Sequence, residues 1–473
     1  MREDSVAVIT EVGVRYTYQQ LEAEVKRVGA NLQECSLAVI LMKNDMDSII
    51  CYLACLSRKV VPILLNYGIH VGTVQMYLSK YQPQYVLLSS KLKFDSQNSF
   101  RTLVKVDSRW LLESRDRKPV KLHKDLCLLL TTSGTSGISK LVRISKENLL
   151  SNTKSICEYL GINESERAIT TLPLSYTYGL SVLNTHLYSG ATILLTSKSI
   201  LQKSFWQFFE KYQATSLSGV PYTYELLEKK GFLHQNFPFL KCMTQAGGKL
   251  PVDLQLKFGG YACKHGINMV LMYGQTEATA RISYLPPEDI LKRPGSVGIA
   301  IPGGKIRIVP CQEMVQSGPI TKQLNQVGKQ DIGEIVYEGD NVSMGYAECL
   351  EDLEMGNQNR GLLYTGDTGY IKDGYLYITG RIARFAKIYG RRINLQALSE
   401  IIDREYQIKN YCYEYQNKII VVCENAKKEQ IQRLSEGLPD NTGLTAHCFI
   451  YKEVKESPRN FAGKHMGRMY ETD

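Results

Sequence analysis

Small hydroxylated residues and glycines follow a strand-like apolar run and end at a lysine, in the segment from Leu128 to Lys140. Glycines let backbone N–H groups converge on an anion, because they tolerate positive φ and carry no Cβ. The hydroxyls add donors and the lysine adds charge, so the segment offers the chemistry that a triphosphate needs. A plain polar turn has a similar composition. The residues expected to contact phosphate are Thr132, Ser133, Gly134, Thr135, Ser136, Gly137 and Lys140.

The same segment does not fit a Walker A loop. That motif requires glycine directly before the lysine and serine or threonine directly after it. Here Ser139 precedes Lys140 and Leu141 follows it. Residues 141–144 also have the apolar character of a strand, whereas a Walker A loop leads into a helix. The sequence therefore argues against a P-loop kinase or ATPase.

Two acidic residues stand in glycine-containing turns further along the chain. Glu277 closes the segment that starts at Tyr273, directly after an apolar run. Ligands gather at the carboxyl ends of strands in α/β sheets, and Mg²⁺ prefers a carboxylate together with phosphate oxygens and waters. We expect Glu277 to bind magnesium, Thr276 to donate to a phosphate or carboxylate, and Tyr273 to offer its ring to adenine. Asp367 can accept from both hydroxyls of a ribose. Solvated or turn-capping carboxylates are the alternatives for both acidic residues.

These residues need a scaffold in which strands and helices alternate. Thr17 begins a capping box with Gln20, and apolar residues then repeat at helical spacing. A helix is also expected over residues 46–56. The alternation predicts an α/β fold with mainly parallel sheets. The apolar runs expected to form strands are residues 37–42, 60–65, 85–88, 126–130, 191–195 and 269–272.

A chain of 473 residues is too long for one ordinary core. A strand-like pattern ends in a basic stretch at Gly380 and Arg381. We place the domain boundary there. Residues 1–380 are expected to form a large, multi-layer N-terminal domain. Residues 381–473 are long enough for a small α+β C-terminal domain.

Composition limits the partners and the compartment. The net charge is +10, but lysine and arginine are spread along the chain, so a nucleic-acid partner is not expected. The same diffuse charge suits small polyanions such as ATP. The twelve cysteines show no zinc-binding spacing, which predicts reduced thiols in a cytoplasmic protein. We expect neither a signal peptide nor a membrane-spanning helix.

Six segments, in order, resemble motifs of the adenylate-forming superfamily, which comprises acyl-CoA synthetases, peptide-synthetase adenylation domains and luciferases. The resemblance covers essentially the whole chain and is closest to acyl-CoA and acyl-carrier ligases. Single motifs are modestly specific, whereas six in sequence with suitable spacing rarely arise by chance. The segments are residues 132–140, 273–277, 333–346, 364–367, 380–390 and 458–464.

The resemblance implies an ATP-dependent ligase that converts a carboxylic acid to acyl-AMP, releases pyrophosphate and passes the acyl group to a thiol. ATP, Mg²⁺ and coenzyme A or phosphopantetheine are the implied cofactors. The resemblance also implies that the N-terminal domain, residues 1–380, binds AMP and that the C-terminal domain, residues 381–473, acts as a mobile lid. Lys464 would bridge the acyl carboxylate and the phosphate, and Arg381 would assist Asp367 at the ribose. Gly390 would let a pantetheine arm pass close to the backbone. The implied adenine and nucleotide contacts also include Gly247, Gly248, Gly274 and Gln275.

The acid-binding end of the site is less strongly marked. Resemblance places Tyr176, Gly219, Gln245 and Ala246 near the acyl group. Many acyl-CoA synthetases have histidine at the position of Tyr176, which can equally be a core aromatic residue. Amino-acid-activating relatives often have an aspartate nearby, and this segment has none. We therefore expect an acid without an α-amino group, because an unpaired ammonium is costly to bury.

The chain also departs from the family pattern. Ala383 stands where the hinge residue is often aspartate or lysine, and Ser139 replaces the usual proline. Neither change removes a catalytic charge. One alternative is the loading of an acid or amino acid onto an acyl carrier protein. Another is a non-catalytic member that only binds nucleotide or acid, but the retained lysines and carboxylates argue against it.

Overall fold

The computed structural model describes residues 4–88, 99–116, 118–131, 140–310, 332–381, 385–388, 391–415, 418–442 and 444–455. The chain forms two compact units. The first comprises Met1–Gly295, Ala300–Lys305 and Glu338–Leu363. The second comprises Ser296–Ile299, Ile306–Tyr337 and Tyr364–Asp473. The expected domain boundary after Gly380 stays a prediction.

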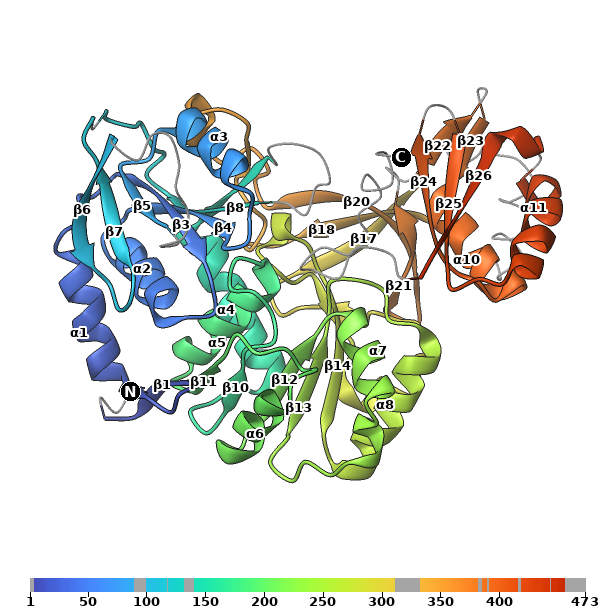
Figure 1. Ribbon diagram of the computed structural model, residues 1–473, viewed down its shortest axis with the longest axis horizontal. Helices are drawn as coiled ribbons and strands as arrows, with labels where there is room; N and C mark the ends of the chain where they lie inside the picture. Colours follow the sequence, from blue (N-terminus) through green and yellow to red (C-terminus); the bar gives the residue numbers. More distant parts are fainter. Residues whose placement is uncertain are drawn as a thin grey trace. The chain divides into compact units, whose positions relative to one another are not determined.

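The first unit contains a nine-stranded sheet that is parallel through its centre (Figure 1). Its order is β16-β15-β14-β13-β12-β10-β11-β1-β2. Antiparallel pairing involves β2 and β15. The strands are β1 (Val6–Thr10), β2 (Arg15–Thr17), β10 (Arg167–Ile169), β11 (Thr192–Leu195), β12 (Ser216–Gly219), β13 (Cys242–Gln245), β14 (Asn268–Tyr273), β15 (Ser283–Tyr284) and β16 (Ile299–Ala300).

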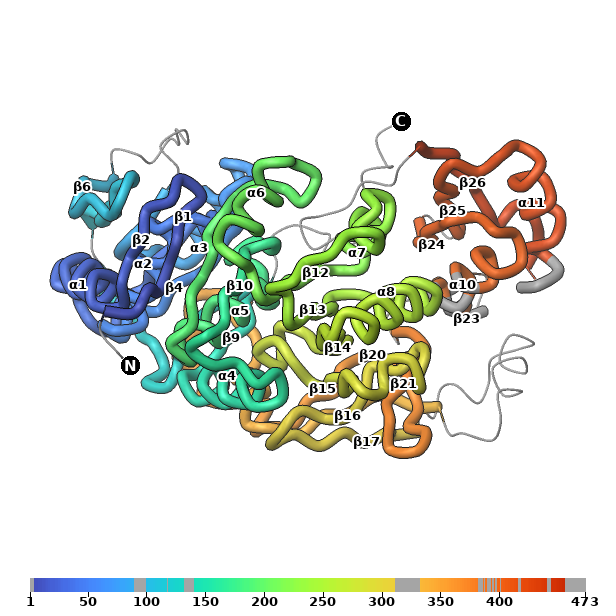
Figure 2. The backbone as a smooth tube through the Cα atoms, turned by 90° about the horizontal axis from the view of Figure 1, so that it is seen from below, coloured from blue at the N-terminus to red at the C-terminus, as the bar shows by residue number. Residues whose placement is uncertain are grey.

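Five helices accompany this sheet. Figure 2 shows α7 beside β12 and α8 beside β14. On other strands, α5 packs against β10 and β11, and α4 packs against α5. The helices are α4 (Lys146–Leu160), α5 (Thr177–Tyr188), α6 (Lys203–Lys211), α7 (Pro221–Lys229) and α8 (Val252–His265).

A second sheet of the first unit has eight strands in the order β19-β9-β8-β4-β3-β5-β7-β6. Its centre is parallel, with β3 between β4 and β5, and its remaining pairs are antiparallel. The strands are β3 (Leu37–Met42), β4 (Val61–Asn66), β5 (Tyr85–Leu87), β6 (Phe100–Lys105), β7 (Trp110–Ser114), β8 (Leu126–Thr131), β9 (Leu141–Ser145) and β19 (Gly345–Ala347).

One apolar core joins the two sheets of the first unit. It contains side chains from β3, β4, β8, β9, β10 and β11, together with α1 (Tyr18–Gly29) and α2 (Met46–Ser57). The opposite face of the eight-stranded sheet packs against α3 (Val71–Tyr81). Every residue of β3 is buried, as expected for a strand covered on both faces. The predicted capping box at Thr17 and Gln20 starts α1.

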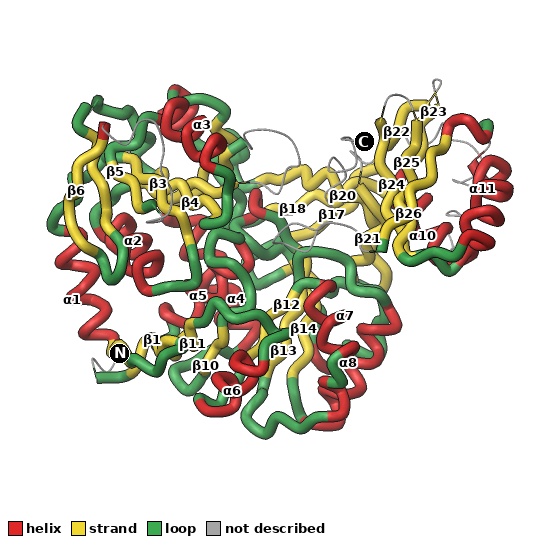
Figure 3. Tube along the Cα trace, in the orientation of Figure 1, coloured by secondary structure: helices red, strands yellow, loops and turns green. Residues whose placement is uncertain are grey.

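The second unit contains three smaller sheets. A four-stranded sheet lies largely within it, in the order β17-β18-β20-β21. Figure 3 shows β24, β25 and β26 as strands beside the helices α10 and α11. These elements share an apolar core. The elements are β17 (Lys305–Pro310), β18 (Gly333–Glu338), β20 (Leu362–Lys372), β21 (Tyr375–Arg381), β22 (Phe385–Ile388), β23 (Arg391–Asn394), α10 (Leu395–Tyr406), β24 (Lys409–Tyr415), β25 (Lys418–Glu424), α11 (Lys428–Thr442) and β26 (Phe449–Val454).

The architecture confirms the predicted α/β class with mainly parallel central pairing. The predicted strand over residues 37–42 matches β3, and the helix over 46–56 matches α2 to within one residue. Short 3-10 helices complete the fold at Phe232–His234, Thr276–Ala278, Pro287–Asp289, Glu351–Glu354 and Ala446–Cys448. None of the helices in the described parts of the chain has the length and apolar character needed to cross a bilayer.

Candidate active site at the carboxyl ends of the central strands

Three predicted site residues lie at one edge of the nine-stranded sheet. Gly219 ends β12 and is paired with Gln245, which ends β13. Gln245 is in turn paired with a residue of β14, the strand that ends at Tyr273. Because β12, β13 and β14 are parallel, their carboxyl ends meet at this edge, where ligands bind in such sheets.

The turn after β14 has a tightly packed backbone. A Cβ on Gly274 would lie 1.9 Å from the carbonyl oxygen of Ala280, so any side chain there would collide with the backbone. The N–H of Ile282 donates to the carbonyl of Tyr273 at 2.8 Å and closes the turn. Gln275 precedes the short helix Thr276–Ala278. The turn thus holds Thr276 and Glu277 just beyond the strand end.

Tyr346 links the two charged groups expected to face phosphate. Its hydroxyl donates to Glu277 Oε1 at 2.7 Å. The ammonium of Lys140 lies 5.6 Å from the centre of the same ring and forms an ion pair with Glu348 at 2.5 Å. Both members of that pair are more than half exposed, so it contributes little to stability. Lys140 and Glu277 are therefore both neighbours of Tyr346, the lysine near its ring and the glutamate at its hydroxyl.

The Glu277 carboxylate suits a magnesium ion that is shared with phosphate. No group of three or more histidine, cysteine, aspartate or glutamate side chains gathers among the described residues. Mg²⁺ does not require such a cage, because one or two carboxylates with phosphate oxygens and waters complete its shell. Glu277 is half-buried and accepts from a neutral phenol, so it keeps lone pairs for a metal.

Arg143 fixes the strand that carries Tyr346. Its side chain is fully buried and lies in β9, which pairs with β19. It donates to the carbonyl of Met344 at 3.1 Å and to that of Tyr346 at 3.0 Å. Further acceptors are the carbonyls of Met355 and Gly356 and the side chain of Gln358. Burial lowers the pKa of Arg143. Sequence analysis missed this residue, although a charge inside an apolar strand was a signal.

Replacing Arg143 by methionine should destabilise the protein. At least four carbonyl oxygens would lose their shared donor in a buried site, and such losses cost about 3 kcal/mol or more. Thermal denaturation should show a clearly lower Tm. Arg27→Met removes an arginine of α1 whose ion pair with Glu24 is partly exposed on both sides, and it is the matched control. A Tm loss no larger than that of the control would contradict the positioning role.

The predicted acyl wall is assembled around Tyr176. A Cβ on Gly247 would lie 2.6 Å from the hydroxyl oxygen of Tyr176, and Gly247 has a φ of +85°. Tyr176 directly precedes α5, and burial raises its pKa. The Gln245 amide donates to the carbonyl of Gly248 at 2.9 Å and so shapes the turn. Ala246 is buried in the same apolar cluster as Tyr176.

α5 joins this wall to the turn after β14. Thr177, its first residue, has its hydroxyl 3.0 Å from that of Thr276. The candidate acid and phosphate ends of the first unit are therefore in direct contact. Several residues of this unit were predicted to bind the nucleotide or the carboxylic acid. Most of those that the structure describes lie at one edge of the sheet or in turns beside it.

The predicted ribose residues lie together in the second unit. Asp367 in β20 and Arg381 in β21 are paired across the two strands. Arg381 donates from Nε to Asp367 Oδ1 at 2.5 Å. The aspartate is 4% exposed, whereas the arginine is exposed. Several predicted residues lie outside the described residues: Thr132, Ser133, Gly134, Thr135, Ser136, Gly137, Ala383, Gly390 and Lys464.

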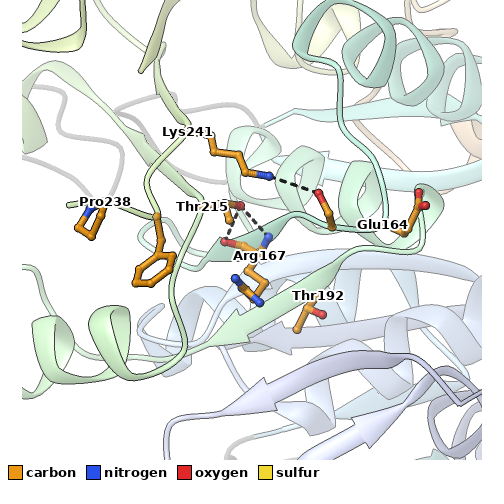
Figure 4. A pocket seen from close by; sticks show the side chains of 8 residues that line it. Glu164, Arg167, Thr192, Thr215, Pro238 and Lys241 are labelled. Atoms are coloured by element: carbon orange, nitrogen blue, oxygen red, sulfur yellow. Dashed lines mark hydrogen bonds between the residues drawn. The ribbon is translucent and has the colours of Figure 1, made fainter. Parts of the chain in front are cut away.

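A surface pocket of about 430 Å³ opens at the opposite edge of the same sheet (Figure 4). Arg167 and Thr192 lie at the amino ends of β10 and β11, and Thr215 and Lys241 directly precede β12 and β13. The backbone N–H of Arg167 donates to Thr215 Oγ1 at 2.7 Å. The pocket contains none of the predicted site residues, and amino ends of parallel strands are not where such sheets bind ligands.

Comparison with known proteins identifies the class. The family model for AMP-binding enzymes matches residues 1–347. The chain belongs to this family. It is an AMP-forming acid–thiol ligase, which uses ATP to activate a carboxylic acid and then transfers the acyl group to a thiol. The resemblance, the fold class and the enzyme class expected from the sequence are therefore confirmed.

Similar proteins include an oxalate–CoA ligase from Arabidopsis thaliana, with 27% identity over 391 residues that cover 77% of this chain and 72% of that protein. A 2-succinylbenzoate–CoA ligase from Bacillus velezensis is 28% identical over 389 residues, covering 80% and 75%. Among solved structures, the o-succinylbenzoate CoA synthetase from Bacillus subtilis with its acyl-adenylate intermediate has a TM-score of 0.76 at 21% identity, covering 100% of this chain and 96% of the other. ATP-bound MatB from Rhodopseudomonas palustris has a TM-score of 0.74 at 20% identity, covering 99% and 95%.

Proposed function

We propose that this enzyme activates a small carboxylic acid with ATP and Mg²⁺ and transfers the acyl group to coenzyme A. The proposal rests on one observation: three parts of the first unit lie close together. They are Lys140, the turn with Thr276 and Glu277, and the wall around Tyr176. Names of related proteins support the choice of acceptor, since both curated relatives described above are CoA ligases.

In the first half-reaction, a carboxylate oxygen of the acid bonds to the α-phosphorus of ATP. The bond between that phosphorus and the oxygen bridging to the β-phosphate breaks. Two anions approach each other and pyrophosphate leaves, so the site must neutralise charge on both sides of phosphorus. Lys140 supplies positive charge on the phosphate side. Thr276 supplies a hydroxyl donor where the acid and the α-phosphate meet.

Glu277 is the proposed magnesium ligand. Its carboxylate accepts from the hydroxyl of Tyr346, the residue whose ring neighbours Lys140. When bound, the metal would neutralise phosphate charge. Asp367, held by Arg381, is the proposed acceptor for the ribose hydroxyls. Lys464 and Gly390 keep the roles that sequence resemblance implies, in adenylation and at the thiol.

In the second half-reaction, the thiol sulfur bonds to the acyl carbon and AMP leaves as the carbon–oxygen bond to phosphate breaks. The thiol proton is released to solvent. Coenzyme A and the phosphopantetheine of a carrier protein present the same thiol. We infer coenzyme A as the acceptor, because the related proteins described above are CoA ligases. We further propose a cytoplasmic location, supported by the eleven cysteines in the described residues being free thiols.

Two assays in series test this proposal. Acid-dependent exchange of labelled pyrophosphate into ATP reports the first half-reaction, and loss of free thiol reports the second. Thioester should form with coenzyme A at micromolar to millimolar concentrations, the common range of KM values. Exchange without any thioester on coenzyme A, but with rapid loading of a phosphopantetheinylated carrier protein, would contradict the proposed acceptor.

A further inference from the structure

A buried arginine lines a cavity next to the acyl wall. The cavity has a volume of about 240 Å³ and lies between α4, α5 and the strands β12, β13 and β14. Arg281 is 3% exposed and is one of the residues that line the cavity. In the sequence, Arg281 stands five residues after Thr276, in the segment that follows the Thr276 turn.

Within the described part of the chain, all the hydrogen bonds donated by the Arg281 side chain go to neutral groups. Its nitrogens donate to Met272 Sδ at 3.3 Å, to the carbonyl of Ala280 at 3.3 Å and to Ser181 Oγ at 3.2 Å. The guanidinium carbon lies 4.1 Å from the centre of the Tyr178 ring. Among the described residues, no carboxylate forms an ion pair with it. Burying a charge without a counter-ion costs free energy. An anion bound beside this arginine would remove that cost.

The other titratable groups of the lining do not supply that anion. Glu166 is already paired with Lys241 at 3.0 Å. Burial raises the pKa of Tyr178 and of the Cys242 thiol to about 12, so both are neutral near pH 7. Burial lowers the pKa of His186 to about 4, so its ring is also neutral. The cavity therefore carries one uncompensated positive charge.

Hydroxyl groups surround that charge. The hydroxyl of Tyr178 is 2.8 Å from Thr244 Oγ1, which is 2.9 Å from Ser218 Oγ. Ser181 completes the polar side, and apolar side chains from α4 such as Ile156 form the other side. An anionic group beside the guanidinium would find further donors here, while its hydrocarbon part would contact the apolar side.

The cavity lies beside the reacting end of the site. Tyr178 lines the cavity, and its neighbour in α5, Thr177, contacts Thr276. The rings of Tyr176 and Tyr178 lie 6.4 Å apart, edge to face. An acid whose carboxylate reacts beside Thr276 would thus direct its other end past Tyr178 towards Arg281.

We propose that the acid is a small dicarboxylic acid, whose second carboxylate pairs with Arg281 while the first is adenylated. This inference rests on the proposed function. The cavity volume of about 240 Å³ lies below the range of roughly 300–1,000 Å³ for drug-sized ligands, which favours a short acid.

Paired acids test the proposal in pyrophosphate exchange. Succinate, glutarate and adipate are each compared with the monocarboxylic acid of the same carbon number. The best dicarboxylic acid should exceed its partner by roughly a hundredfold in kcat/KM, the scale of a buried charge pair. Arg281→Met should lower exchange with that acid by roughly a hundredfold and leave exchange with the monocarboxylic partner unchanged or raised. Arg281→Lys should recover part of the difference.

Two further variants keep the test decisive if Arg281→Met folds poorly. Ser181→Asp keeps the arginine but places a carboxylate beside it, so it should remove the preference for dicarboxylic acids. Arg167→Met removes an arginine at the opposite end of the same sheet, hydrogen-bonded to Gln213, and should leave the preference unchanged.

The outcomes separate this inference from the proposed function. No exchange with any acid would contradict the ligase function itself. Equal exchange with dicarboxylic and monocarboxylic acids would overturn only the role of Arg281. A second result would also overturn that role: Arg281→Met loses exchange equally with all acids, and Ser181→Asp keeps the preference for dicarboxylic acids. The arginine would then be structural.

Discussion

Lys464→Ala is expected to reduce adenylation by about 10²–10³ in kcat, the scale of losing one pre-organised electrostatic group in an active site. The lysine stands in the segment 458–464, which matches a family motif. A compact ammonium at the acyl carboxylate and the α-phosphate stabilises charge that is greatest in the transition state. Acid-dependent pyrophosphate exchange measures this step directly.

Thioester formation from chemically prepared acyl-AMP should be largely retained in Lys464→Ala, because that half-reaction does not require charge neutralisation at an incoming carboxylate. Lys455→Ala, ahead of the motif, is the matched control and should leave both half-reactions intact. Normal pyrophosphate exchange in Lys464→Ala would show that the assignment is wrong. Equal losses in both half-reactions would indicate a structural role instead.

Glu277→Gln should lower turnover by about a hundredfold, since a carboxylate facing polyphosphate is replaced by a neutral amide of the same shape. The magnesium concentration needed for half-maximal exchange should rise at the same time. The Tm should change little, because Glu277 is half-buried in a turn and its side chain makes one hydrogen bond to the described residues, the bond from Tyr346.

Tyr346→Phe separates the metal role of Glu277 from its hydrogen bond. This variant keeps the carboxylate and the ring beside Lys140 but removes the donor. It should reduce exchange less than tenfold, the scale of one neutral hydrogen bond near 1 kcal/mol, and should leave the magnesium requirement in place. A large Tm loss in Glu277→Gln, with full specific activity in the folded fraction, would mean that the carboxylate is structural.

Local sequence patterns predicted much of the scaffold. The all-apolar run over residues 37–42 has the composition of a strand buried on both faces, and it forms β3 at the centre of a sheet. The pair Thr17 and Gln20 starts α1 as expected. Such features depend on neighbouring residues alone, so they can be recognised without knowledge of the tertiary structure.

Tertiary contacts were harder to predict. The four-stranded sheet β17-β18-β20-β21 groups largely with the C-terminal residues, yet nothing in its composition marks that association. Arg281 stands in an ordinary polar segment, and its burial depends on packing against Tyr178 from another part of the chain. Arg143 likewise acts through carbonyls about two hundred positions away in sequence. Long-range contacts of this kind leave little local signal.

Acid-dependent exchange of labelled pyrophosphate into ATP, across a panel of acids with and without Mg²⁺, is the most direct test of the central claim. Exchange should require magnesium and should be strong with at least one small acid that lacks an α-amino group. It should be at least tenfold weaker with the corresponding amino acid. Absence of exchange with every acid, in protein that binds ATP and is folded, would contradict the assignment as an AMP-forming ligase.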